Sequence, residues 1–502
     1  MKKYIFIMFA AIALTACESE LELTSPSELT AQGFWDTEEG ASAAHAGLYA
    51  DLRSNYSTLW LFGEIRSDIW GGRTFESSFN VDLIESNITA ATAPFDWLSF
   101  YERIHRVNDF LKNVPDIEFS NNATKQHMLG QAYGLRAFYY YTLLKTWGGV
   151  PVITEPLADV NPSGLSKARS SQAEVMVQVK TDIEASLSAF GSQNFFGDGS
   201  IYWSKAATLA LKGDVYIWSG NLMGGGSPDF NVAKTALQQI ASLGMSLESS
   251  IPDLWGVENE DNSEFIFTLQ YKQDEASNIY NSFTGRSTEI HEVYNDKGEF
   301  MGPSGIDFII NGANRYGPSE KTLLLTDDND DARKEATFIR LFVDDNGGAG
   351  YDSYVESRYY GSVFNKFLGR IDGTQRIFEN DVPVYRYADV LLLLAEARNL
   401  LGEDPSGEIN LVRERAYGAN YTPIVHAYSN SSQTDNANAI LDERYKEFVG
   451  EGKRWWDLRR AGNSFVINNI EFLSAGDEYK LLLPITQNMI GRNPLLEQTP
   501  GY

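Results

Sequence analysis

Apolar residues recur at helical spacing in several long stretches of the chain. In segment 129–147 they lie about 3.6 residues apart, at positions 129, 132, 133, 137, 140, 143, 144 and 147. Gly148, Gly149 and Pro151 follow directly, and residues of these types stop a helix. The pattern therefore predicts a helix over 129–147, and a four-residue apolar repeat predicts a partner helix over about 172–190.

The same arrangement of paired helices is predicted twice more. A second pair is expected over 203–220 and 231–244, and a third over 385–402 and 406–418. Small residues stand where such helices can cross closely: Ala207, Ala210, Ala388 and Ala395. The pairs resemble degenerate tetratricopeptide repeats, although the strict repeat spacing is absent. The predicted fold class is mostly α, an α-solenoid of tetratricopeptide-like helix pairs with long irregular, partly β insertions.

Between about 245 and 383 the helical rhythm fades. Segment 265–271, FIFTLQY, has the composition of a strand, whereas 285–320 is rich in Gly, Asn and Ser and disfavours a long helix. Binding residues tend to lie on loops that a rigid scaffold carries. We therefore predict one domain over 33–502, made of a helix-pair core at about 33–245 and 384–460 and a loop-rich ligand-binding insert at about 246–383.

The N-terminus has the pattern of an export signal. In MKKYIFIMFAAIALTAC two lysines precede an apolar run that is too short to span a bilayer, and small residues follow. Leu-Thr-Ala-Cys at 14–17 resembles a bacterial lipobox, so we predict a signal peptide over 1–16 and lipidation at Cys17. Cys17 is the sole cysteine, which excludes an intramolecular disulfide and a CxxC metal site.

The segment 17–32 is predicted to be an acidic tether between the lipid and the fold. It holds Glu18, Glu20, Glu22 and Glu28 among serines and threonines. Acidic residues directly after the lipidated cysteine resemble the surface-export signal of Bacteroidota lipoproteins. We therefore expect the protein on the outer face of the outer membrane, and no later segment is long and apolar enough to span a membrane.

Net charge decides how the basic segment KRWWDLRR at 453–460 is interpreted. The chain has 41 Lys and Arg against 68 Asp and Glu, a formal charge of −27, which disfavours binding to nucleic-acid phosphates. We expect Trp455 and Trp456 to pack into the core. Arg454 and Arg459 are expected to pair with nearby carboxylates such as Glu443, Glu447, Glu451 or Asp457. Four other tryptophans are also expected to be buried: Trp97, Trp147, Trp203 and Trp218.

Catalytic signatures are absent from the sequence. There is no GxSxG, HExxH, P-loop or GxGxxG motif, so we predict a protein that is not an enzyme and needs no cofactor. With so many acids, a glycosidase pair of carboxylates stays open. The segment TDDNDDAR at 326–333 lacks the glycine and the final glutamate of an EF-hand, so a solvated turn is favoured over a calcium site.

Four stretches resemble motifs of the SusD/RagB family of outer-membrane nutrient-binding lipoproteins, in the family's order. They are 134–156, with Leu-Arg-Ala and Trp-Gly-x-Val-Pro; 383–399, with Ala-Glu-Ala; 442–462; and 481–502, with the ending Pro-Gly-Tyr. Three departures from the family pattern are visible: Asp389 replaces a Glu, Thr486 a Pro and Thr499 an Asn.

This resemblance implies a SusD-like fold and a binding function. It implies a surface lipoprotein that captures oligosaccharide or polysaccharide and delivers it to a TonB-dependent, SusC-like transporter in the outer membrane. Two alternatives stay open: capture of peptide or another nutrient by the same architecture, and a repeat scaffold that binds only protein. An exposed aromatic cluster on the loop side would distinguish glycan capture from the protein scaffold.

A glycan platform needs exposed aromatic rings beside polar side chains, because sugar rings present apolar C–H faces and hydroxyl groups. The loop 66–80 contains four candidates for ligand contact: Trp70, Arg73, Phe75 and Asn80. The insert contributes two more, Tyr294 and Tyr316.

Overall fold

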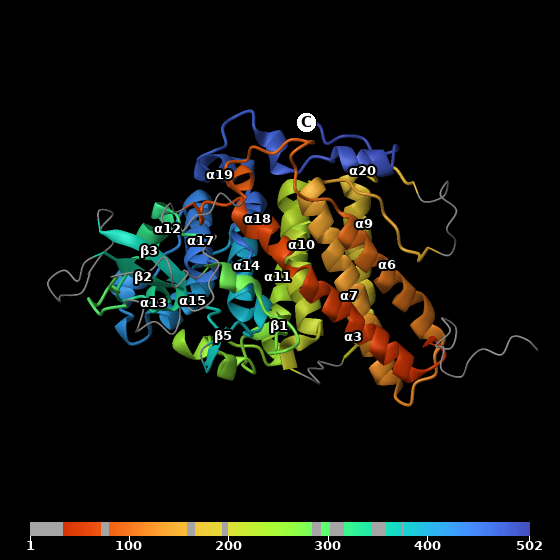
Figure 1. The fold of residues 1–502 in the computed structure, drawn as a ribbon, viewed down its shortest axis with the longest axis horizontal. Coiled ribbons are helices and arrows are strands. Elements are labelled where there is room, and N and C mark those ends of the chain that lie inside the picture. Colours follow the sequence, from red (N-terminus) through yellow and green to blue (C-terminus); the bar gives the residue numbers. More distant parts are fainter. Residues whose placement is uncertain are drawn as a thin grey trace, which may run out of the picture.

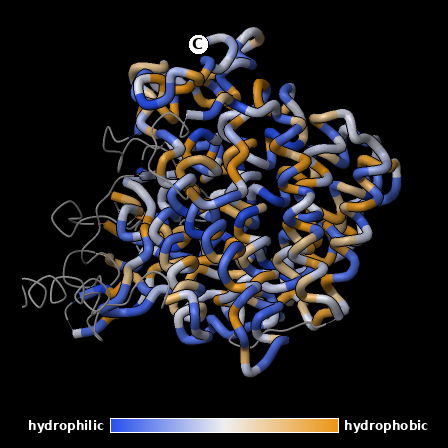
Figure 2. The backbone as a smooth tube through the Cα atoms, turned by 90° about the vertical axis from the view of Figure 1, so that its right-hand side faces the viewer, coloured by the Kyte–Doolittle hydropathy of each residue, from blue (hydrophilic) through white to orange (hydrophobic). Residues whose placement is uncertain are grey.

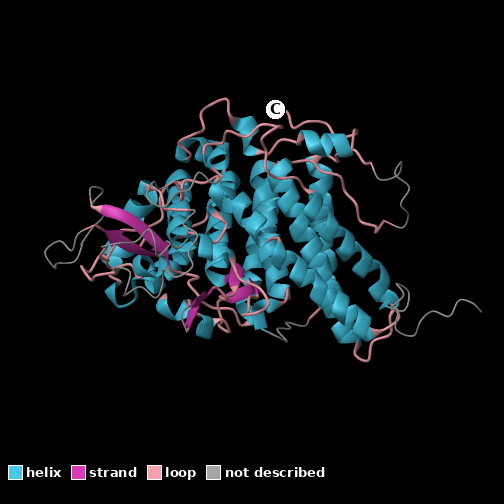
Figure 3. Ribbon diagram, in the orientation of Figure 1, coloured by secondary structure: helices cyan, strands magenta, loops and turns pink. Residues whose placement is uncertain are grey.

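The computed structural model describes residues 34–71, 80–157, 166–192, 199–283, 293–301, 316–343, 358–373 and 375–502. Helices fill most of the molecule, and the strands lie toward one end and the lower edge in the view of Figure 3. The predicted mostly helical fold class is confirmed. No helix in these described ranges is long and apolar enough to cross a membrane.

The first half of the chain forms a layer of long helices, which stand side by side at the right of Figure 1. They are α3 (Glu38–Ser54), α6 (Leu98–Asn113), α7 (Asn122–Trp147), α9 (Gln172–Phe190), α10 (Lys205–Leu222) and α11 (Gly226–Ile240). Helix α7 packs extensively on α9, and α10 on α11. The first two predicted pairs are therefore confirmed.

Local sequence signals explain where these helices begin and how closely they pack. Ser171 and Glu174 form a capping box at the start of α9, which satisfies backbone N–H groups that the helix itself leaves free. Gly134 faces the indole of Trp203 so closely that a Cβ there would lie 2.2 Å from its Nε1 atom. A glycine at this position therefore lets α7 approach Trp203.

The second half continues the helical layer. It comprises α14 (Tyr387–Leu400), α15 (Ser406–Tyr417), α16 (Pro423–His426), α17 (Gln433–Phe448), α18 (Arg454–Ala461), α19 (Asn463–Asn469) and α20 (Gln487–Arg492). Helix α14 packs on α15, which confirms the third predicted pair, and also on α17 and α11. The contact between α11 and α14 joins the two halves of the scaffold.

The insert contains short strands in three two-stranded antiparallel sheets. They pair as β1 (Phe265–Leu269) with β6 (Val382–Arg386), β2 (Phe338–Phe342) with β3 (Tyr359–Phe364), and β4 (Arg370–Asp372) with β5 (Gln375–Ile377). The strand predicted at 265–271 is thus confirmed as β1. Because β6 leads directly into α14, the first sheet attaches the insert to the scaffold.

Shorter elements connect these units. Four are short α-helices, α4 (Tyr56–Trp60), α5 (Val81–Ile84), α12 (Glu320–Leu325) and α13 (Arg333–Thr337), and η1 (Leu61–Ile65) is a π-helix. The 3₁₀ turns are η2 (Val114–Asp116), η3 (Gly199–Ile201), η4 (Ala241–Leu243), η5 (Pro252–Leu254), η6 (Val257–Asn259), η7 (Ile279–Phe283), η9 (Gly418–Asn420) and η10 (Glu478–Leu481).

One large apolar cluster runs through most of the helical layer. Apolar and polar segments alternate along the helices in Figure 2, as expected when one side of a helix packs inward. The four tryptophans predicted to be buried, Trp97, Trp147, Trp203 and Trp218, all belong to this core.

Candidate ligand-binding site

Trp70 is enclosed by other aromatic rings. Its side chain is 3% exposed, and its ring centroid lies 5.0 Å from that of Phe283 and 5.9 Å from that of Trp60. Phe338 and Phe364 cover it further, at 6.2 and 6.0 Å. The prediction that Trp70 offers an exposed face to ligand is therefore wrong, because segments distant in the chain pack over the ring.

Asn80 and Tyr316 lie beside the same cluster. Tyr316 is 7% exposed, with its ring 6.4 Å from Trp70 and 5.2 Å from Trp60. The Asn80 side-chain amide donates to the Tyr316 hydroxyl at 2.7 Å. The structure thus brings three of the predicted residues together, but as an interior contact. Of the other predicted residues, Arg73, Phe75 and Cys17 lie outside the described residues.

Tyr294 is placed differently, on a hairpin at the edge of the second sheet. Its backbone N–H donates to the Phe342 carbonyl at 2.9 Å, and the Phe342 N–H donates back at 2.8 Å. The chain then turns at 295–298, and Phe300 returns opposite Tyr294. The Tyr294 and Phe300 ring centroids are 5.5 Å apart, and Phe300 is 50% exposed while Tyr294 is half-buried.

We call Tyr294 and Phe300 the aromatic pair. Sequence reasoning identified Tyr294 but missed Phe300. The signal was available, since Asn-Asp-Lys-Gly at 295–298 is a turn sequence with an aromatic residue close on either side, and cross-strand neighbours in a hairpin share a face. Among the predicted candidates that the structure describes, Tyr294 is the one that reaches the surface beside a second ring.

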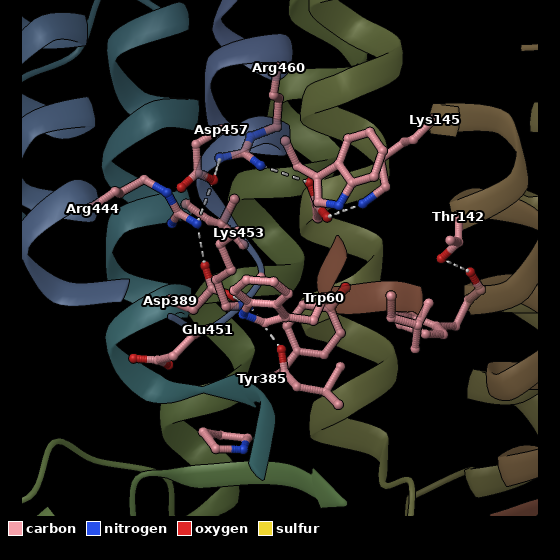
Figure 4. Close-up of a pocket in the computed structure, with 18 of the residues that line it drawn as sticks. Trp60, Thr142, Lys145, Tyr385, Asp389, Arg444, Glu451, Lys453, Asp457 and Arg460 are labelled. Atoms are coloured by element: carbon pink, nitrogen blue, oxygen red, sulfur yellow. Dashed lines mark hydrogen bonds and ion pairs between the residues drawn. The ribbon is translucent and has the colours of Figure 1, made fainter. Parts of the chain in front are cut away.

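The segment 453–460 forms a buried network of charges (Figure 4). Arg460 pairs with Glu396 at 2.8 Å, Asp457 at 3.0 Å and Asp214 at 3.1 Å. Arg444 bridges Asp389 and Asp457, at 2.7 and 2.8 Å. These positive charges are paired with carboxylates inside the core, and the arginines of the segment are buried, so it presents no basic surface.

The packing of Trp455 and Trp456 into the core is confirmed, but the predicted ion-pair partners are wrong. Arg454 pairs with Asp68, at 2.9 Å from its Nε atom. Arg459 donates to the backbone carbonyls of Leu481 and Lys145, and it makes no ion pair within the described ranges. Burial lowers the pKa of Arg459 to about 9. Arg454 finds a remote partner because α18 packs on η1 near the start of the chain as well as on its neighbours α17 and α19.

A cavity of about 80 Å³ lies beside this network. Lys145 Nζ lies 4.0 Å from Asp214 Oδ2 and rests over the rings of Tyr141 and Trp456, at 4.3 and 4.7 Å. Burial lowers the pKa of Lys145 to about 8. The cavity has room for a few water molecules. It is therefore an internal polar pocket of the core and not a site for an oligosaccharide.

The acidic segment 326–333 is folded into the protein, so the predicted solvated turn is only partly correct. Asp331 pairs with Arg333 and Asp327 with Lys334, both at 2.7 Å, and all four side chains are largely buried. Asp330 is exposed. Across the residues that the structure describes, no group of three His, Cys, Asp or Glu is arranged to hold a metal ion.

The structure combines a helical scaffold with a hairpin that carries the aromatic pair at the surface. Comparison with protein families identifies the family. The model of the SusD family matches residues 256–502, and a second model, described as starch-binding associating with outer membrane, matches residues 21–217. The chain belongs to the SusD family.

Individual relatives are similar to this chain over different shares of its length. B. fragilis NanU is 35% identical and superposes with a TM-score of 0.84 over 95% of this chain and 99% of its own. SusD-like protein P38 of Formosa agariphila is 29% identical over 99% of this chain and 98% of its own length. The starch-binding protein SusD of Bacteroides thetaiotaomicron is 32% identical over 25% of this chain and 22% of its own length.

Proposed function

We propose that this protein is a lipid-anchored receptor on the cell surface that binds oligosaccharide and delivers it to a TonB-dependent, SusC-like transporter in the outer membrane. The observation that carries the proposal is the exposed aromatic pair on the loop side of the helical scaffold. Aromatic faces hold the C–H faces of sugar rings without a deep pocket. Family membership supports glycan as the ligand, since one family model and one relative are described as starch-binding.

The protein acts by binding and not by catalysis in this proposal. Many buried carboxylates of the described core are paired with arginine or lysine, as at Arg460 and Arg386. A carboxylate paired in this way has no access to a glycosidic oxygen, and the pKa of Asp389 is lowered beside Lys453 and Arg444. Incubation with a glycan should therefore release no shorter products.

The test is affinity electrophoresis of the purified mature protein against a panel of polysaccharides. Retardation by at least one neutral glycan is expected, and Tyr294→Ala should reduce it. The matched control is Tyr479→Ala, which removes an exposed tyrosine from a distant surface. Retardation by none of the glycans, together with binding to peptides, would contradict glycan capture. Release of shorter products would contradict the absence of catalysis.

The anchor is tested separately. Cys17→Ala should leave a folded protein that no longer partitions with membranes, because acyl chains supply about 0.8 kcal/mol per buried CH₂. Cell fractionation in a strain without the transporter measures this. Persistent membrane association of the variant in that strain would contradict the lipid anchor.

A further inference from the structure

A cleft of about 1100 Å³ opens between α13, the end of α15 and the segment 250–256. Its volume is at the upper end of the range for ligand pockets. Helices α13 and α15 lie near the left of Figure 1, in the part of the molecule that holds the insert. Neither ring of the aromatic pair lines this cleft, but Asp296 and Lys297 of the same hairpin do, so the cleft adjoins the aromatic pair without including its rings.

The cations on the floor of the cleft already have buried hydrogen-bond and ion-pair partners. Lys366 donates to Glu451 Oε1 at 2.8 Å and to the Glu447 carbonyl at 2.7 Å. Arg415 pairs with Glu264 at 2.8 Å and also with Glu447. These cations are already neutralised by buried carboxylates, so the floor does not offer a free positive charge to an anion.

The rim carries two carboxylates, of which Asp296 feels the positive charges of Lys334 and Lys297. Among the residues that the structure describes, none forms an ion pair or hydrogen bond with the side chain of Asp296 or Asp330, although both line the cleft. Asp296 is partly buried, and burial raises its pKa. An ionised carboxylate only accepts hydrogen bonds, so these two groups can accept from the hydroxyl groups of a ligand in place of water.

One wall is aromatic. Trp255 is half-buried and lines the cleft, and its ring packs edge to face on Phe367 with centroids 5.2 Å apart. Because neighbouring side chains fix this indole, it presents a firm, partly apolar surface. An apolar wall facing hydrogen-bond acceptors suits a ligand with C–H faces and hydroxyl groups.

The charged side chains that line the cleft indicate whether its ligand is charged. The ionisable side chains that line the cleft are nearly balanced: Lys297, Lys334, Lys366, Arg376 and Arg415 against Asp296, Asp330, Asp331 and Glu335. The chain as a whole carries −27, which repels polyanions. The balance therefore favours an uncharged ligand.

We propose that this cleft is a second carbohydrate-binding site, which takes an uncharged oligosaccharide whose hydroxyl groups donate to Asp296 and Asp330 while a ring lies against Trp255. The proposal rests on the proposed glycan-binding function, and adds a site distinct from the aromatic pair. Two sites on one receptor would let a long glycan chain be held at two points, which raises its effective affinity.

The test is hydrogen–deuterium exchange of the full mature protein with a mixture of neutral oligosaccharides from starch, laminarin, inulin and mannan. We expect protection of 250–256, 329–336 and 415–420, in addition to the hairpin 293–301. Asp330→Ala should lower affinity at the cleft by about tenfold, as expected for loss of a hydrogen bond to a charged group. Asp330 is preferable to Asp296 for this test because Asp296 shares the hairpin of Tyr294.

Controls separate this proposal from the proposed function. Glu118→Ala removes an exposed carboxylate elsewhere and should change neither site. Phe300→Ala should weaken protection of the hairpin but leave the cleft protected. Protection confined to the hairpin would overturn the second site alone, whereas protection of neither region would overturn both proposals. Cleft protection that is lost with a metal chelator, or that is stronger with sulfated oligosaccharides, would overturn the assignment to a neutral glycan.

Discussion

Trp70 and Phe300 are both large aromatic residues in loop-rich segments, yet Trp70 is buried and Phe300 is exposed. Trp70 is covered by five other rings, whereas Phe300 stands half-exposed beside Tyr294 at the edge of a sheet. Glycines beside Trp70 suggested an open loop, but the backbone there pairs with Pro318 and carries the ring inward. Composition near an aromatic residue is therefore a poor guide to its exposure.

The largest effect expected from this comparison is on stability at Trp70. Trp70→Ala should lower the free energy of unfolding by about 3–5 kcal/mol, because it leaves a cavity among packed rings. Denaturant unfolding followed by circular dichroism measures the change. An unchanged unfolding midpoint together with lost glycan affinity would show that this ring faces ligand in solution and would contradict its burial.

A similar contrast is expected between buried and exposed charges. Arg460→Met should cost about 3–5 kcal/mol, because Glu396, Asp214 and Asp457 would lose their shared partner in the core. Arg106→Met, which removes an exposed arginine paired with Asp51, should cost less than about 1 kcal/mol. Equal losses of stability in the two variants would contradict the assignment of 453–460 to the structural core.

The aromatic pair should give the reverse pattern, a loss of binding with little loss of stability. Phe300→Ala should weaken glycan binding by about 1–3 kcal/mol, the range for truncating an interface anchor. Because the ring is 50% exposed, the unfolding midpoint should hardly move. Calorimetric titration with the glycan identified by the panel measures the affinity, and equal affinities would remove Phe300 from the site.

A smaller, pH-dependent effect is expected at Glu64, which lies near Trp70. Burial raises the pKa of Glu64 to about 8, although the N–H groups of Gly450 and Lys453 donate to its carboxylate at 2.6 and 3.1 Å. In the unfolded chain this group releases its proton near its ordinary value of 4.5. Between these values the native state binds more protons, so this contribution to stability falls as pH rises from about 5 to 8.

Glu64→Gln should remove that pH dependence. The unfolding free energy of Glu64→Gln minus that of wild type should increase with pH across this window, by up to about 1.4 kcal/mol per pH unit, because the wild type loses stability and the variant does not. Thermal or denaturant unfolding at several pH values measures the slope, and Glu118→Gln serves as an exposed control. Parallel stability curves for wild type and Glu64→Gln would contradict the raised pKa.

Much of this protein follows from its sequence because the determining interactions are local. The four-residue apolar repeat predicts a helix over about 172–190, and the structure has α9 over Gln172–Phe190. The buried positions of Trp147, Trp203 and Trp218 follow from the same periodicity. Helix formation depends on residues three and four positions apart, so a single sequence carries that information.

Only the tertiary structure decided which aromatic residues are exposed and which charges are paired. Phe283, Phe338 and Phe364 cover Trp70 from positions more than 200 residues further along the chain, and Arg454 pairs with Asp68 rather than with a neighbour. The cleft between 250–256 and the end of α15 likewise exists only once these segments meet. Such contacts depend on the packing of whole elements, and neither residue type nor local spacing encodes the identity of a partner so distant in sequence.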